Sequence, residues 1–184
     1  MKTVSSWLAG VALSLFLVLG VSANTQLDSP STAGRSDAGH SWMQWPSVGQ
    51  ARLKWGFWTL YDSELRAPDG EFLGVERDVA LVIHYRRNID RAALLQATDK
   101  QWQHLGIDGE RRQRWLARLA QLWPDVRKGD RLIFAIESGQ GRFYLERTLL
   151  GTIDDPQLSQ QFLQIWLSPD TAYPKLRRQL LGHS

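Results

Sequence analysis

The order of hydrophobic periodicities along this 184-residue chain constrains its fold more than any single motif does. Alternating apolar residues, which are typical of strands, occur at 51–61, at 79–85 and in three short runs between 132 and 153. Apolar residues at helical spacing occur at 90–105, at 108–123, from 156 onward and at 174–181. Strands, helices, strands and helices in that order predict an α+β fold in which helices pack on an antiparallel sheet.

Two strand predictions underlie this interpretation. The alternation over 51–61 is interpreted as one long strand with a possible bulge at Gly56. The large side chains on one of its faces are Trp55, Phe57, Thr59 and Tyr61. Residues 79–85 are apolar on both faces, because Ala80 and Val82 alternate with larger apolar residues. This second strand is therefore predicted to be central and covered on both sides.

Aspartates stand where three of the predicted helices begin. Asp90 and Asp108 each precede a run of helical spacing, and Asp155 precedes Pro156, which suits the first turn of a helix. The pair Asp154-Asp155 could also be taken as an acid and base for catalysis. Because proline follows directly, helix capping is the favoured interpretation.

The N-terminus is interpreted as a signal peptide over residues 1–23. Lys2 precedes a 15-residue apolar run, and the small residues of Val21-Ser22-Ala23 suit cleavage after Ala23. The run is shorter than the ~20 residues that a membrane-spanning helix needs. We therefore expect a periplasmic or secreted protein with no stable membrane span after cleavage. Residues 24–41, rich in small polar residues, are predicted to be a flexible leader to one domain over 42–184.

Composition and motifs exclude several classes of function. A net charge of +3 is too balanced for a typical nucleic-acid-binding domain, so no nucleic-acid partner is expected. The chain has no cysteine and no Gly-x-Ser-x-Gly sequence, which argues against covalent catalysis. The histidines lie far apart and lack the spacing of a zinc site, at His40, His84, His104 and His183. No metal and no cofactor is predicted.

Segments in the last third of the chain resemble one known family. They include Pro124-Asp125-Val126, the run from Gly141 to Leu145, Asp154-Asp155, and Leu176 to Gly182. Over about residues 49–182 the chain resembles the bacterial chalcone isomerase-like family. The resemblance implies an open-faced β-sandwich, in which an antiparallel sheet is layered with helices and a cleft opens between them. Glu146-Arg147 stands where this family usually has Asn-Gly, the natural two-residue hairpin turn.

The resemblance does not carry over a catalytic site. The related plant enzymes cyclise chalcones with a strand threonine, a tyrosine and an asparagine on a helix, and a late hydroxyl. These positions fall near Gly56, Asp90, Ala97 and Asp155, and none of them matches. The catalytic residues are therefore unknown. Non-catalytic relatives of this fold are thought to bind fatty acids, so the resemblance implies an exported binder of a fatty acid or another elongated apolar ligand.

Five residues are candidates for contact with such a ligand. Thr59 and Tyr61 would offer hydroxyls from one strand face, and His84 lies within the central strand. Arg86 and Arg87 follow that strand and could bind a carboxylate head group. Plain core packing, a hydrogen-bonded histidine and a solvated strand end are the alternative interpretations of the same residues.

Two other functions stay open at this point. The first is an isomerase, an intramolecular lyase, whose site differs from that of the plant enzymes and uses Thr59, Tyr61 or His84 as acid and base. The second is an interaction module in which exposed tryptophans, such as Trp42 and Trp45, dock on an unknown protein partner in the cell envelope.

Overall fold

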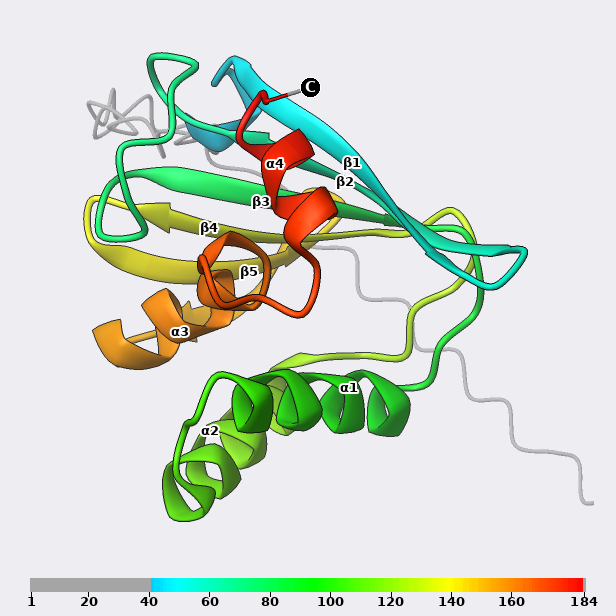
Figure 1. The fold of residues 1–184 in the computed structure, drawn as a ribbon. Helices are drawn as coiled ribbons and strands as arrows, with labels where there is room; N and C mark the ends of the chain where they lie inside the picture. The colour runs from blue at the N-terminus through cyan, green and yellow to red at the C-terminus, as the bar shows by residue number, and fades with distance from the viewer. Residues whose placement is uncertain (1–40, 184) are drawn as a thin grey trace, which may run out of the picture. The chain divides into compact units, whose positions relative to one another are not determined.

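A six-stranded antiparallel sheet organises the protein, in a computed structural model that describes residues 41–183 (Figure 1). The strands are hydrogen-bonded to their neighbours in simple chain order. They are β1 (Ser47–Trp55), β2 (Trp58–Arg66), β3 (Val79–Tyr85), β4 (Arg131–Glu137), β5 (Gln140–Leu145) and β6 (Thr148–Ile153). The predicted signal peptide and all but the last residue of the predicted leader lie outside the described residues.

The prediction of one long strand over 51–61 is wrong. Gly56 and Phe57 form the turn of a hairpin, in which Trp55 on β1 pairs with Trp58 on β2. Gly56 has a φ of +59°, and glycine is the residue that adopts this left-handed conformation without strain. The turn alone shifts the alternation by one residue, because Trp55 and Trp58 are paired on the same face. A register shift then leaves Leu60 as an extra residue and brings Tyr61 opposite Leu53, so alternate apolar residues continue at odd-numbered positions and resemble one strand.

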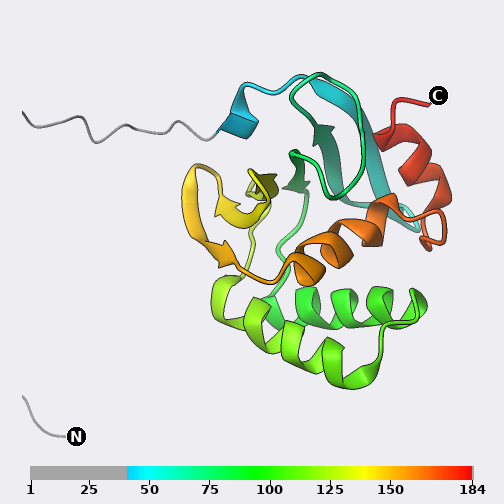
Figure 2. The same ribbon diagram turned by 90° about the vertical axis from the view of Figure 1, so that its left-hand side faces the viewer.

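Four helices cover one face of the sheet, which we call the inner face (Figures 1 and 2). They are α1 (Arg91–His104), α2 (Gly109–Leu122), α3 (Pro156–Leu167) and α4 (Pro174–Leu180). The predicted caps are confirmed, because Asp90, Asp108 and Asp155 each accept a backbone N–H from the first turn of α1, α2 and α3. Asp155 also accepts the indole N–H of Trp115 on α2, at 2.8 Å, and so connects two helices.

The main core lies between the inner face and α3. Phe134 on β4, Phe143 on β5 and Phe162 on α3 pack with ring centroids 4.6 to 5.1 Å apart. Trp123, at the end of α2, contacts both Phe143 and Phe162. Offset and edge-on ring pairs of this kind add to the stabilisation that apolar burial provides. The α+β prediction is confirmed, with the helices layered on an open antiparallel sheet.

The opposite, outer face carries a smaller core. Ala80 and Val82 on β3 pack there with Ile133, Ala135 and Tyr144. A 3₁₀-helix, η1 (Ser41–Met43), covers this cluster with the side chain of Trp42, which is 6% exposed. The strand at 79–85 is thus central and covered on both sides, as predicted, except that His84 is only half-buried.

The turn between β5 and β6 forms although it lacks the Asn-Gly of the family pattern. Glu146 has a φ of +56°, which is strained for a residue with a side chain. Its carboxylate accepts hydrogen bonds from the backbone N–H of Arg131 at 2.7 Å and from the Arg131 guanidinium at 2.6 and 2.8 Å. These contacts offset the strain of the turn. Within residues 41–183, no helix has the length and hydropathy to cross a bilayer.

Candidate functional site

A cavity of about 160 Å³ lies between the inner face of the sheet and the helices. Its wall comes from β1, β2, β3 and β4 on one side and from α1, α3 and the start of α4 on the other. The residues at its base are buried apolar side chains: Ile83, Leu132, Trp123, Phe162 and Ile165. A cleft between sheet and helices is therefore present, and its lining is predominantly apolar.

The mouth of the cavity lies beside α1. Ala93 and Ala97 line the cavity and are exposed to solvent, so the helix presents only small side chains at this edge. Leu53 and Leu60, from the β1–β2 hairpin, are half-buried and line the opposite side. An apolar ligand can enter between the hairpin and α1 without crossing a layer of bulky side chains.

Three tyrosines and one amide supply polar groups in this lining. The hydroxyl of Tyr61 accepts a hydrogen bond from the indole N–H of Trp166 at 2.8 Å. The hydroxyl of Tyr173 accepts one from the Gln101 side chain at 3.1 Å. Tyr85 lies directly opposite Tyr61 in the sheet, with the ring centroids 6.1 Å apart. Burial raises the pKa of Tyr61 and of Tyr85 far above the ordinary value, so both hydroxyls keep their protons.

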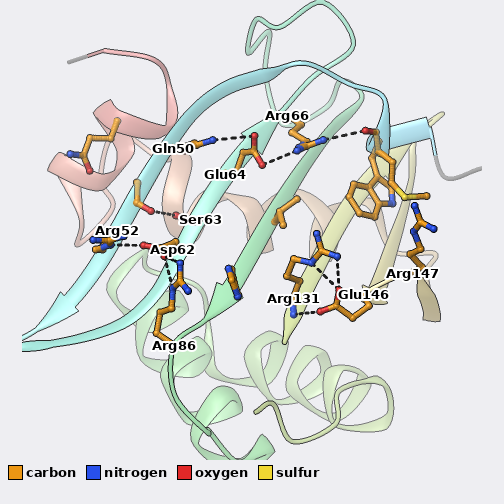
Figure 3. Close-up of a pocket in the computed structure, with 16 residues that line it drawn as sticks. Gln50, Arg52, Asp62, Ser63, Glu64, Arg66, Arg86, Arg131, Glu146 and Arg147 are labelled. Atoms are coloured by element: carbon orange, nitrogen blue, oxygen red, sulfur yellow. Dashed lines mark hydrogen bonds and ion pairs between the residues drawn. The ribbon is translucent and has the colours of Figure 1, made fainter. Parts of the chain in front are cut away.

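A second hollow, of about 780 Å³, lies on the outer face and is lined by charged side chains (Figure 3). Asp62 lies between Arg52 and Arg86 and contacts each of them at 2.5 Å. Glu64 pairs with Arg66 at 3.0 Å. Burial opposes the charged form of Asp62, but the hydrogen bonds and charges of Arg52 and Arg86 together lower its pKa. Because these charges pair with one another, an anionic ligand would have to displace a carboxylate to bind here.

The structure does not bring the five predicted contact residues together. Tyr61 lines the apolar cavity, whereas His84 and Arg86 line the charged hollow on the opposite face. Thr59 is half-buried and lines neither. Arg87 is exposed and stacks on Trp58, with its guanidinium carbon 4.0 Å from the ring centroid. Tyr61 is paired with Tyr85 and shares its face of the sheet. Because side chains alternate between faces along a strand, the adjacent His84 points to the opposite face and cannot share a site with Tyr61.

Tyr61 is the only predicted contact residue among those that line the cavity, and two further tyrosines of the lining were missed by sequence analysis. Tyr85 ends β3, and its pairing with Tyr61 depends on a register that the sequence does not give. Tyr173 immediately precedes the helix-starting Pro174, and it reaches the cavity because the chain returns across the sheet after α3. No local pattern marks either residue as part of a site.

The prediction that Trp42 is exposed is wrong. Its indole is buried against the outer face, and Trp45 is half-buried on the same cluster. The most exposed aromatic residues that the structure describes are Phe57 and Trp58, at 103% and 57% exposure, in the β1–β2 hairpin. In the part of the chain that the structure describes, no three metal-ligating side chains come together.

Comparison with known proteins places the fold and the family. A family model described as chalcone isomerase-like matches residues 57–182, more than half of the chain. The chain belongs to the chalcone isomerase-like family. A Haemophilus influenzae protein described as uncharacterized is 29% identical to this chalcone isomerase-like protein over 138 residues, which are 75% of this chain and 68% of that protein.

A solved structure has the same fold. The crystal structure of an Arabidopsis thaliana fatty-acid binding protein superposes with a TM-score of 0.57 at 10% identity. The match covers 73% of this chain and 85% of the plant protein. At this identity the likeness shows the fold, which is the sheet layered with helices that the family resemblance implies.

Proposed function

We propose that this chalcone isomerase-like protein is exported and binds a fatty acid or another elongated apolar ligand between its sheet and its helices, without catalysing a reaction. The observation that carries the proposal is the apolar cavity with its mouth at Ala93 and Ala97. Binding sites for small molecules are concave and mostly apolar, with a few polar groups that fix orientation. The cavity has this composition, and the charged hollow on the outer face does not.

The volume of the cavity limits how much of a ligand it encloses. An apolar cavity of roughly 150 Å³ takes up benzene, whereas pockets for drug-sized ligands span roughly 300–1,000 Å³. At about 160 Å³, the cavity holds a ring or a short length of acyl chain. The rest of an elongated ligand extends through the mouth, or α1 moves outward to admit it.

Two further observations support binding. The Arabidopsis protein of the same fold is a fatty-acid binding protein, which makes an apolar ligand the natural expectation for this cavity. The three side chains considered for an isomerase site, Thr59, Tyr61 and His84, do not converge. A buried Tyr61 with a raised pKa would also be a poor base, because it holds its proton.

Extraction of the bound ligand tests the proposal. The mature protein, residues 24–184, would be purified from the periplasm under mild conditions, extracted with solvent and examined by mass spectrometry. We expect a near-stoichiometric lipid or similar apolar molecule. An empty protein that also takes up neither a fatty acid nor its methyl ester when titrated would overturn the binding function and make a chalcone cyclisation assay the next experiment.

A matched pair of variants tests the location. Ala97→Trp places a bulky ring at the mouth, whereas Gln96→Trp places the same ring at an exposed position of α1 that does not line the cavity. We expect Ala97→Trp to lose the ligand and Gln96→Trp to keep it, with equal helical circular dichroism. Equal loading of both variants would show that the ligand binds elsewhere.

Export is tested separately by the mass of the mature chain. Cleavage after Ala23 predicts that protein recovered from the periplasm begins at Asn24. A chain that retains Met1 and stays in the cytoplasmic fraction would contradict export. It would not bear on ligand binding, which the extraction experiment tests separately.

A further inference from the structure

Three of the four tyrosines in the chain line the same apolar cavity. Tyr61 and Tyr85 come from adjacent strands, and Tyr173 comes from the residue before α4. The hydroxyl of Tyr61 lies within electrostatic reach of both other tyrosines. The fold needs apolar side chains in this lining, but it does not need a cluster of hydroxyls there.

The three hydroxyls do not make all the hydrogen bonds that they can make. Each phenol can donate one hydrogen bond and can also accept. Tyr61 and Tyr173 accept from Trp166 and Gln101, but among residues 41–183 no group accepts the proton of either hydroxyl. The Tyr85 hydroxyl has no hydrogen-bond partner at all in that part of the chain, although the residue is only 4% exposed. The cavity lining therefore holds three phenol donors without acceptors, in addition to the buried indole N–H of Trp123, which also has no partner among residues 41–183.

Charge is missing from the same lining. None of the described residues around the cavity is an arginine, lysine, histidine, aspartate or glutamate. Arg86 and Arg87, the arginines predicted to bind a carboxylate, lie on the outer face and against Trp58. An ionised carboxylate buried without a cation is strongly unfavourable, whereas a neutral acceptor loses far less on leaving water.

Resting on the proposed function, we propose that the polar end of the ligand is an uncharged carbonyl, as in an ester, amide or ketone, that accepts hydrogen bonds from the Tyr85 hydroxyl and from Tyr61 or Tyr173. Such a group supplies an acceptor for two of the three phenols and brings no charge into the cavity. The apolar remainder of the molecule then lies against the base of the cavity and in its mouth. The preferred ligand class is a neutral acyl compound, and the free fatty acid anion binds more weakly.

Three probes of similar length separate these possibilities: hexanoate, methyl hexanoate and n-octane. Their affinities would be measured by tryptophan fluorescence, because Trp123 and Trp166 line the cavity. We expect methyl hexanoate to bind at least ten-fold more tightly than hexanoate, which is ionised at neutral pH. Tighter binding of hexanoate would overturn the inference and leave the proposed function intact, whereas no binding of any probe would contradict the proposed function itself.

Variants show whether the phenols make the contact. Tyr85→Phe removes a hydroxyl that has no partner, so folding should be unaffected, and it should weaken methyl hexanoate roughly three- to ten-fold while leaving n-octane unchanged. Tyr173→Phe provides a second test from a different element. Tyr144→Phe, on the outer face, is the control outside the cavity. It removes a hydroxyl that donates to Glu137, so its folding is checked by circular dichroism, and it should change neither affinity. Equal affinities for methyl hexanoate in the wild type and in both cavity variants would overturn the inference.

Discussion

At the scale of single residues, the carboxylate of Glu137 contacts four different residues. Its carboxylate accepts from the Ser41 hydroxyl at 2.6 Å, from the Tyr144 hydroxyl at 2.9 Å and from the Trp42 amide at 3.3 Å. It also pairs with Arg142 at 3.2 Å. One buried carboxylate thus attaches η1 to the sheet and holds Trp42 over the outer core.

Glu137→Gln is expected to destabilise the fold. The amide keeps the shape but loses the charge that strengthens four contacts, so the free energy of unfolding should fall by about 1–3 kcal/mol. Urea denaturation at pH 7 would measure the change. Glu71→Gln is the control, because Glu71 is exposed, and it should stay within about 0.5 kcal/mol of the wild type. Equal losses in both variants would show that the contacts of Glu137 contribute nothing specific.

The contribution of Glu137 should also depend on pH. Burial opposes ionisation, but hydrogen bonds from Ser41, Tyr144 and the Trp42 amide, with the charge of Arg142, lower its pKa below 4.5. A carboxyl with a depressed pKa in the folded state stabilises the fold above the unfolded pKa and loses this effect as pH falls through the folded pKa.

The stability difference between wild type and Glu137→Gln is therefore expected to be full at pH 7 and to shrink below about pH 4.5. Urea denaturation of both proteins at a series of pH values would measure it. Other carboxylates with lowered pKa, such as Asp62 and Glu146, act in both proteins and cancel in the difference. A stability difference between the two proteins that grows toward low pH would contradict the lowered pKa of Glu137.

At the scale of elements, the close approach of α4 to β1 depends on Gly49. A Cβ at this position would overlap the backbone carbonyl oxygens of Gln179 and Leu180 and the amide of Gly182. These are backbone atoms, which cannot rotate away as the end of a side chain can. The helix packs beside β1 only because residue 49 has no side chain (Figure 1).

Gly49→Ala is expected to displace α4 and to cost about 1–3 kcal/mol, the usual range for overpacking. Gly109→Ala is the matched control, because a Cβ there meets no atom and α2 begins at this residue. The control should be neutral or slightly stabilising, since alanine restricts the unfolded chain more than glycine does. Thermal unfolding of the two variants would measure both effects, and equal midpoints would contradict the close approach.

Elements were predictable from sequence where local chemistry sets them. The aspartate caps and Pro156 fix helix starts, so the positions of α1, α2 and α3 follow from the chain alone. The β1–β2 hairpin was missed because the register shift at Leu60, just after the Gly56-Phe57 turn, returns Tyr61 to the face of Leu53 and restores the period-two pattern. Phe57 lies in this turn and is exposed to solvent, so it does not share a strand face with Trp55 as predicted.

At the scale of the whole molecule, the site depends on which face of the sheet each residue joins. Tyr61 lines the cavity as predicted, whereas Thr59, which the same alternation placed on its face, does not, because the chain forms two strands with a register shift between these residues. Sequence could not show that Arg86 pairs with Asp62 of the neighbouring strand, or that Tyr173 returns to the cavity after α3. Both depend on how the chain bends between elements, for which the sequence carries no local signal.

The two helices that wall the cavity differ in how firmly they are held. Seven residues of α3 are buried against the sheet, whereas only Leu94, Thr98 and Trp102 of α1 are buried. Local unfolding occurs most readily in elements that have few buried contacts. If a ligand larger than about 160 Å³ requires the cavity to widen, α1 is therefore the wall that moves, and α3 stays on the sheet.

Hydrogen exchange would detect this movement. Binding of methyl hexanoate should slow amide exchange most in α1, because a ligand that contacts Ala93, Ala97 and Thr98 removes openings in which this helix leaves the sheet. Amides of β4 and β5, in the interior of the sheet, are expected to exchange through global unfolding and to gain only the overall stabilisation, about 2.7 kcal/mol at a hundred-fold excess over Kd. Added protection confined to α3 would contradict this, because it would make the innermost helix the mobile wall.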